Sequence, residues 1–117
     1  MNEGTQLAEE LLNLSHPGVS EDDIFDAYVG ALLVDNRTLT QDVLNEFHVL
    51  YPANDSANGG IFNTGDSLFD RAAAWYTDEM FLAPRRLFFE KAATSQPLYG
   101  YHFTELVPPN PPLLGGK

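Results

Sequence analysis

Apolar residues at helical spacing run through most of this chain, and one short segment departs from that pattern. The clearest helix is predicted to begin at Asp66 or Ser67, either of which can cap the first free backbone amides. The apolar residues that recur along one face of this helix are Leu68, Ala72, Trp75 and Tyr76. Residues 98–103 instead alternate around aromatic side chains, which is typical of a β-strand. A single strand cannot satisfy its own backbone groups, so this segment is either a packed extended segment or part of a sheet built mostly by another stretch of chain.

Further helices are predicted from their start signals. A short helix through Leu7 and Leu11 ends before the turn at residues 16–18, which reads His-Pro-Gly. Ser20, followed by three acidic residues, predicts a second helix, and Thr40 predicts a third that ends before Tyr51.

Loop and breaker residues divide the rest of the chain. Residues 53–65 are rich in Asn, Asp, Ser and Gly and predict a loop. Pro84 is predicted to break the helix that begins near Asp66 and to open a second segment over residues 85–93. The residue pattern therefore predicts a mostly helical chain with four to five helices and one clear strand.

Charge and composition exclude several partners and chemistries. The 117 residues carry a formal net charge of -11, with only six Lys and Arg residues, so nucleic acid is not an expected partner. No apolar run approaches the roughly 20 residues that a membrane span needs. The chain has no cysteine, which excludes disulfides, thiolate metal sites and cysteine nucleophiles.

Sequons and the N-terminal residues give opposite indications about secretion. The first residues are polar, so no signal peptide is expected on this chain as given. Three Asn-x-Ser/Thr sequons, at Asn13, Asn36 and Asn54, nevertheless make these side chains candidate N-glycosylation sites.

No complete active site is encoded by motif. The chain has no Gly-x-Ser-x-Gly nucleophile elbow and no Gly-rich phosphate loop. His16, His48 and His102 do not have metal-ligand spacing with one another or with the acids, so no metal site is expected. His102, between two aromatic residues, is interpreted as a packed histidine and not as a catalytic base. Arg86 is expected to pair with Glu90 one helical turn away, and not to bind an anion.

The sequence resembles the type-B carboxylesterase/lipase family, which includes fungal lipases and cholinesterases. Residues 65–86 read Gly-Asp-Ser-Leu-Phe-Asp-Arg-Ala-Ala-Ala-Trp-Tyr-Thr-Asp-Glu-Met-Phe-Leu-Ala-Pro-Arg-Arg, and the aromatic segment at 98–103 follows. In this family an Ala-rich helix leads into Pro-Arg-Arg or a close variant, then a helix, a proline and a Tyr-x-Tyr-x-Phe strand. Residues 2–5, Asn-Glu-Gly-Thr, also resemble the family segment that contains the triad acid.

The resemblance implies that the chain is a partial C-terminal region of a carboxylesterase type-B domain with an α/β-hydrolase fold. Residues 1–19 would follow the triad acid, 20–95 would form the helical region, and 96–117 would contain the strand and a Pro/Gly-rich tail. Glu3 matches the position of the acid in the Ser-His-Glu triad, where it orients the histidine. The serine, the oxyanion-hole glycines and the histidine of the family pattern have no counterpart in this chain.

These implications predict a fragment of a secreted carboxylic ester hydrolase that is inactive alone. The parent would hydrolyse an ester substrate without a cofactor, and this chain would pack against the rest of the hydrolase domain. Two alternatives stay open at this point. The chain is an acidic, non-enzymatic interaction module derived from an esterase, or it is a small helical protein whose likeness to esterases is accidental.

Overall fold

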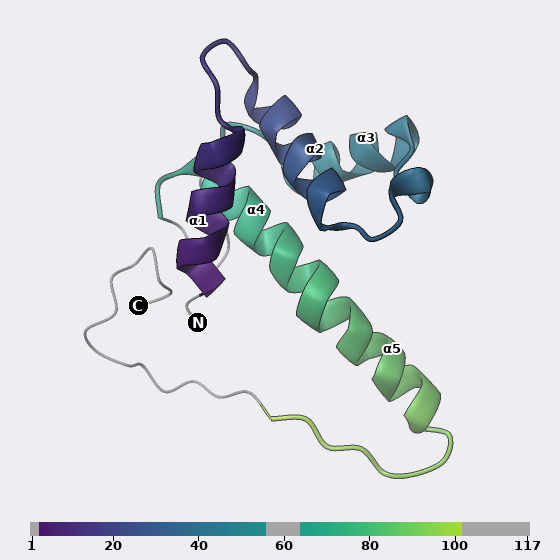
Figure 1. Cartoon of the computed structure of the whole chain (residues 1–117). Coiled ribbons are helices and arrows are strands. Elements are labelled where there is room, and N and C mark those ends of the chain that lie inside the picture. The colour runs from purple at the N-terminus through teal and green to yellow at the C-terminus, as the bar shows by residue number, and fades with distance from the viewer. Residues whose placement is uncertain (1–2, 56–63, 102–117) are drawn as a thin grey trace, which may run out of the picture.

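The computed structural model describes residues 3–55 and 64–101, with side chains from Gln6 onward (Figure 1). The α-helices in these ranges are α1 (Glu3–Leu14), α2 (Glu21–Leu32), α3 (Gln41–Leu50), α4 (Ser67–Thr77) and α5 (Ala83–Ala92). A 3₁₀ turn, η1, spans Asn36–Thr38, and a π-helical segment, η2, spans Asp78–Leu82. The described part of the chain is thus a small all-helical domain.

The expected α/β class is wrong, because the two described ranges contain no strand. Residues 98–101, the first part of the predicted strand, are irregular, and His102 and Phe103 lie outside the described residues. Aromatic alternation can stabilise a strand only where a second strand pairs with it. Here the segment instead passes close to a helix, since a Cβ built on Gly100 would lie 3.5 Å from Cζ of Phe89 in α5.

The predicted helix starts are confirmed by their capping bonds. Ser20 Oγ accepts a hydrogen bond from the Asp23 amide at the start of α2, over 3.1 Å. Thr40 Oγ1 accepts the corresponding bond at the start of α3. At α4 the cap is Asp66, whose Oδ1 accepts from the Phe69 amide over 3.1 Å. Each oxygen satisfies an amide that the helix itself leaves unpaired.

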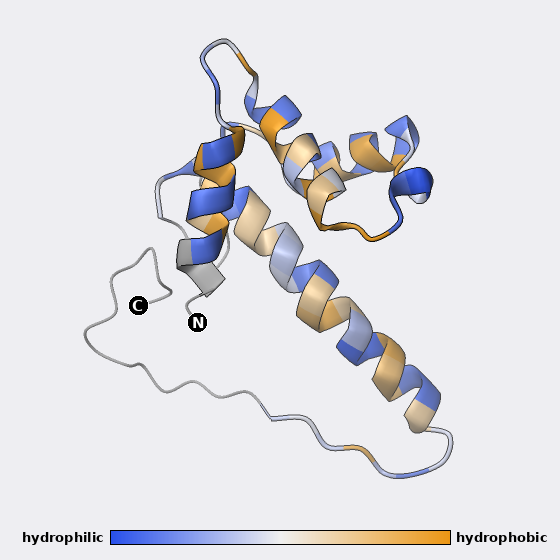
Figure 2. Cartoon of the chain, in the orientation of Figure 1, coloured by the Kyte–Doolittle hydropathy of each residue, from blue (hydrophilic) through white to orange (hydrophobic). Residues whose placement is uncertain are grey.

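Three of the helices, α1, α2 and α4, form the core. Each one contacts the other two, and their amphipathic sequences are visible as alternating polar and apolar segments (Figure 2). The buried hydrophobic residues are Leu7, Leu11, Ile24, Phe25, Tyr28, Val29, Phe69, Ala72, Ala73 and Trp75. A fourth helix, α3, packs on this core through Phe47 and through Tyr51, the residue directly after the helix, and both side chains are partly buried. The core is therefore formed by α1, α2 and α4 with α3 packed against it, and α5 contributes no buried residue to it.

Helices α4 and α5 form one continuous rod through η2, and α5 extends away from the other helices (Figure 1). Pro84 lies in the first turn of α5, as predicted, but the predicted break does not occur. In η2 the Ala83 amide donates to the Asp78 carbonyl, the wider i to i-5 bond of a π-helix. Proline has no amide to donate, and the wider π-helical turn directly before Pro84 lets the chain continue without interruption.

Candidate functional site

A buried charged cluster joins the first turn of α2 to α4. Arg71, on α4, is only 2% exposed, and its Nη1 lies 2.8 Å from Oδ1 of Asp22 and 3.3 Å from Oε1 of Glu21. The guanidinium carbon is 4.3 Å from the centre of the Phe25 ring, which places the cation over an aromatic face. Two acids and one ring thus surround a cation that sits inside the domain.

The hydrogen bonding of this cluster is incomplete. Arg71 Nε and Nη2 are buried without a hydrogen-bond partner. The short contact to Asp22 Oδ1 is an ion pair without hydrogen-bond alignment, because that oxygen also lacks a hydrogen-bond partner. Stabilisation of this cation therefore comes mainly from charge and from the Phe25 ring.

Glu21 also accepts hydrogen bonds from two other segments. Ser67 Oγ donates to Glu21 Oε1 over 2.8 Å, and the Asn54 amide donates to Oε2 over 3.4 Å. A serine hydroxyl beside a glutamate resembles part of a hydrolytic triad, but the triad places a histidine between the two. Here the contact is direct, so Ser67 has no base to activate it, and the arrangement holds the 53–55 segment against α2 and α4.

The carboxylate of Asp70 binds Thr64, which lies shortly before the start of α4. It is completely buried and accepts from the Thr64 amide, 2.9 Å from Oδ2, and from Thr64 Oγ1, 2.8 Å from Oδ1. Gly65 follows with φ of +91°, a left-handed conformation that favours glycine. Asp70 therefore anchors the chain where it enters α4.

A histidine–aspartate pair connects α3 to α2. Nε2 of His48 lies 2.7 Å from Oδ1 of Asp26, and both side chains are about one-quarter exposed. No partner for His48 is predicted from the sequence, because the two residues are separated by 22 positions. The pair is a tertiary contact between α2 and α3.

The residues singled out from the sequence are scattered over the described structure. Glu3 is the first residue of α1, and its side chain lies outside the described residues. The three sequon residues are exposed in separate elements: Asn13 in α1, Asn36 in η1, and Asn54 in the loop after α3.

The other candidates give equally little evidence of a catalytic centre. His16 is exposed in the turn after α1, and His102 lies outside the described residues. The predicted Arg86–Glu90 ion pair is wrong, because the ion pairs within 4.0 Å in the described ranges involve other residues. Arg85 and Arg86 instead line an open groove between α5 and residues 100–101. Among the side chains that the structure describes, none of the predicted site residues are therefore brought together.

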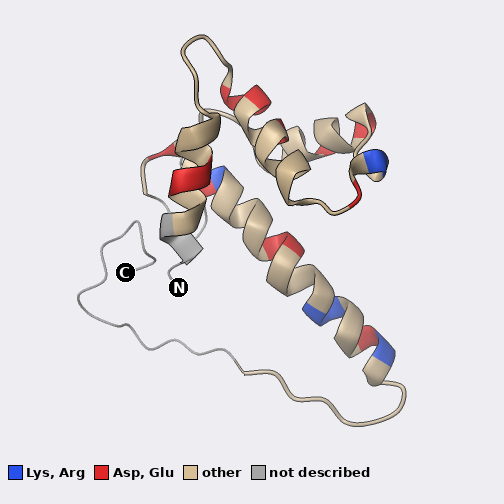
Figure 3. Cartoon of the chain, in the orientation of Figure 1, with Lys and Arg blue, Asp and Glu red and all other residues tan. Residues whose placement is uncertain are grey.

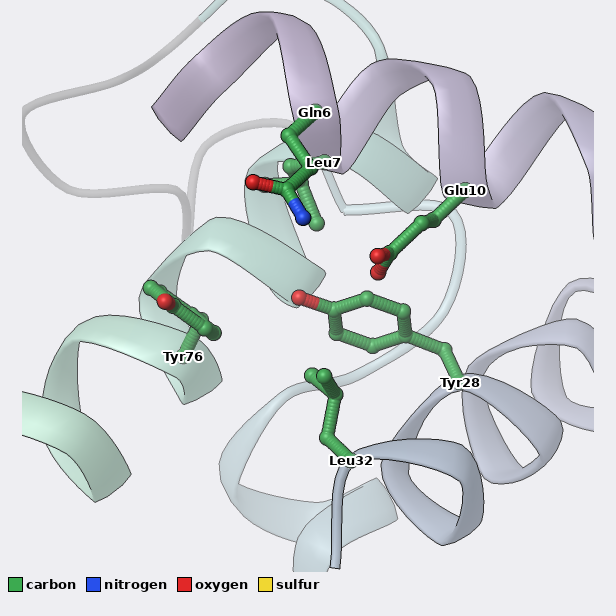
Figure 4. A pocket seen from close by; sticks show the side chains of 6 residues that line it. All are labelled: Gln6, Leu7, Glu10, Tyr28, Leu32 and Tyr76. Atoms are coloured by element: carbon green, nitrogen blue, oxygen red, sulfur yellow. The ribbon is translucent and has the colours of Figure 1, made fainter. Parts of the chain in front are cut away.

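A small pocket opens between α1, α2 and α4 (Figure 4). Its lining residues are Gln6, Leu7, Glu10, Tyr28, Leu32 and Tyr76. Its volume of about 60 Å³ is far below the roughly 300–1,000 Å³ of pockets that enclose a whole small molecule. It can admit a few waters or the end of a longer ligand, but not an ester substrate.

Arg71 and Asp70 are not predicted from the sequence as site residues, and the pocket residues Leu7 and Tyr76 are predicted only as apolar positions of helices. One signal for Arg71 was present, since it lies four residues before Trp75 and so on the same side of α4 as the core. Its partners Glu21 and Asp22 were interpreted only as dipole-favouring acids at a helix start. That interpretation holds for their position, but they also neutralise a buried cation.

Two tyrosine hydroxyls have raised pKa values. Burial raises the pKa of Tyr28 well above its usual 10.0, and the negative charge of Glu10 adds to the effect. Burial likewise raises the pKa of Tyr51, whose hydroxyl also donates to Oδ2 of Asp78 over 2.7 Å. In both cases the folded domain favours the neutral phenol.

We expect the stability of the domain to fall at alkaline pH. The contribution of Tyr28 and Tyr51 is fully present below the unfolded pKa of 10.0 and is lost as the pH rises above it. Guanidinium midpoints at pH 8, 10 and 11 should decrease above pH 10, and Tyr51→Phe should flatten that decrease. Tyr99→Phe, at a side chain 91% exposed, is the control. An equal flattening in both variants would contradict this origin.

Comparisons with known proteins add no relative. No family model, no curated protein and no solved structure matches this chain. In the part of the chain that the structure describes, no three His, Cys, Asp or Glu residues are grouped to hold a metal ion. None of the helices described is both long enough and apolar enough to span a membrane.

Proposed function

We propose that this chain is the helical C-terminal region of a secreted carboxylic ester hydrolase of the type-B carboxylesterase/lipase family, and that it is inactive alone. Glu3 would orient the catalytic histidine of the parent enzyme, while the serine and the histidine would come from other parts of that enzyme. The partner of this chain is then the rest of the hydrolase domain. In a secreted parent, the exposed Asn13, Asn36 and Asn54 would be available to carry glycans.

The observation that carries this proposal is the apolar surface of the rod formed by η2 and α5. Met80, Phe81, Leu87 and Phe88 are each between 49% and 58% exposed. Large apolar side chains gathered on one element mark a surface that packs against another protein part. All four residues fall within residues 65–103, the segment that most resembles the esterases. The same segment therefore has both the family-like sequence and the uncovered surface.

A second candidate is an acidic, non-enzymatic interaction module. It is favoured by the core that α1, α2 and α4 bury among themselves, together with the charged cluster around Arg71. A module of this kind should be a monomer that melts in one cooperative transition. A region that needs the rest of a hydrolase should self-associate through its uncovered α5 surface. Sedimentation and calorimetry of the isolated chain separate the two.

A chimera tests the esterase proposal directly. Residues 3–101 are placed in a type-B carboxylesterase in exchange for its corresponding segment, so that the host supplies the serine and histidine. We expect the chimera to hydrolyse p-nitrophenyl butyrate, and Glu3→Gln to reduce kcat by about 10³- to 10⁴-fold, as loss of a triad acid does. The isolated chain should show no hydrolysis above background.

The matched control is Glu9→Gln in the same chimera, because Glu9 is an exposed acid on the same helix. It should leave kcat unchanged. A folded chimera without activity, or one in which Glu3→Gln and Glu9→Gln behave alike, would refute the role of Glu3.

A further inference from the structure

The pocket between α1, α2 and α4 brings together polar groups from three helices. Gln6 and Glu10 approach it from α1, Tyr28 from α2 and Tyr76 from α4 (Figure 4). The Gln6 amide, the Glu10 carboxylate and the Tyr28 hydroxyl point toward the same space. Tyr28 is 2% exposed. No hydrogen bond or ion pair joins these groups to another described residue, and Gln6 is exposed while Glu10 is partly exposed, so the polar side of the pocket is open to solvent and to a ligand.

The combination of groups selects for a cation with N–H donors. The Glu10 carboxylate only accepts hydrogen bonds, and the Tyr28 hydroxyl oxygen can also accept. The Gln6 amide nitrogen faces the pocket in Figure 4, and a half-turn of this side-chain amide would present its carbonyl oxygen as a third acceptor. A primary ammonium has three N–H donors, which matches three such acceptors. The rings of Tyr28 and Tyr76 add faces that attract a cation. A calcium ion would require six to eight oxygen ligands, more than these side chains offer.

The size of the pocket limits how much of a ligand can enter. A volume of about 60 Å³ accommodates an ammonium group with one or two carbons, since a single water occupies about 30 Å³ in the liquid. The walls beyond the polar groups are formed by Leu7 and Leu32, which suit an alkyl chain. The ligand is thus the end of a longer molecule.

We propose that this pocket binds a primary alkylammonium group, with Glu10 as its counter-ion. Gln6 and Tyr28 accept the remaining N–H donors, and Leu7 and Leu32 contact the first carbons of the alkyl chain. Either a lysine side chain or a free alkylamine offers this chemistry. The site does not depend on the esterase proposal, because it is built from residues of the described domain alone.

The test is a titration of the full chain with n-butylammonium chloride, followed by ¹H–¹⁵N NMR. The side-chain amide of Gln6 and the backbone amides of Glu10 and Tyr28 should shift and saturate. Glu10→Gln should weaken binding about tenfold or more, because it removes the charged acceptor. Tyr28→Phe keeps the ring and should weaken binding about fivefold, which gives a second reading if the first variant is poorly folded.

Controls separate this site from general attraction to a chain of net charge -11. Glu9→Gln removes the same charge from an exposed neighbour and should leave the affinity unchanged. Tetramethylammonium, which has no N–H donor, and neutral n-butanol should not saturate the same signals. Shifts that grow linearly with butylammonium, equal shifts in Glu10→Gln and Glu9→Gln, or a pocket that holds only water would overturn the proposal.

A second titration identifies the source of the ammonium group. Nα-acetyl-lysine methylamide presents the same group on a peptide backbone. Tighter saturation by this probe than by n-butylammonium assigns the site to a lysine of a protein partner, and the reverse assigns it to a free amine. Failure of both probes overturns the site.

Discussion

Trp75→Ala is expected to give the largest loss of stability of the substitutions considered for this domain. The indole is 2% exposed. The centroid of its ring lies 5.9 Å from the ring centroid of Tyr28, 6.2 Å from that of Phe47 and 6.4 Å from that of Phe25. It is therefore the side chain at which α2, α3 and α4 meet. Replacing a buried Trp with Ala costs about 3–5 kcal/mol, and domains of this size have about 5–15 kcal/mol in total. Guanidinium denaturation followed by far-ultraviolet circular dichroism measures the loss.

Phe88→Ala is the matched control for this prediction. Phe88 is also a large aromatic residue on a helix, but it is 58% exposed on α5. Its replacement should change the free energy of unfolding by no more than about 0.5 kcal/mol. Similar denaturation midpoints for the two variants would show that Trp75 does not lie at the centre of the core.

Arg71→Met should give the second largest loss of stability. Removing one partner of a buried ion pair typically costs about 3–5 kcal/mol, because the remaining charge is left without compensation. The Glu21 and Asp22 side chains are 19% and 43% exposed, so water can reach them once the guanidinium is gone. We therefore expect a loss of about 2–3 kcal/mol, below the range for completely buried pairs. Chemical denaturation at low and high salt is the measurement.

A control and a double-mutant cycle make this prediction specific. Arg86→Met changes the net charge equally but removes an exposed side chain without an ion pair, so it should be nearly neutral. Adding Glu21→Gln to Arg71→Met should cost less than the sum of the two single changes. Simple additivity would mean that the two groups do not interact and that Arg71 acts only by packing on Phe25.

The two proposals divide the molecule between its ends. The esterase proposal uses the uncovered apolar surface of η2 and α5 and the triad-like position of Glu3. The proposed ammonium site lies at the other end of the molecule, in the core region where α1, α2 and α4 contact one another. The basic residues of α5 also contrast with the acidic residues spread over α1 to α3 (Figure 3). Helix α5 thus contains three of the six basic residues of this acidic chain, together with the exposed side chains of Leu87 and Phe88.

Helix starts could be predicted because they depend on neighbouring residues. Ser20, Thr40 and Asp66 each cap a helix through an amide three positions later, which is a local relation visible in the sequence. The strand at 98–103 could not be judged in the same way. Its aromatic alternation is local, but a strand forms only if a distant segment pairs with it, and residues 98–101 have no such partner in the described ranges.

Pro84 shows how a local rule can be correct and its consequence wrong. Proline disrupts a helix interior, and the sequence correctly placed Pro84 in a first turn. In η2 the backbone changes to the wider π-helical geometry directly before Pro84, which has no amide to donate. The chain therefore continues, and α4, η2 and α5 remain one rod. The widening is a backbone adjustment that periodicity at 3.6 residues does not reveal.

The sequence by itself determined where the helices begin, which residues are apolar, and that the chain is strongly acidic. Only the tertiary structure decided which charges meet. Glu21 and Arg71 are 50 positions apart, and Asp26 and His48 are 22 apart. The ammonium pocket likewise requires residues from three helices. Capping and periodicity depend on neighbours within a few residues, whereas these contacts form only when packing of the apolar faces fixes how the helices lie against one another.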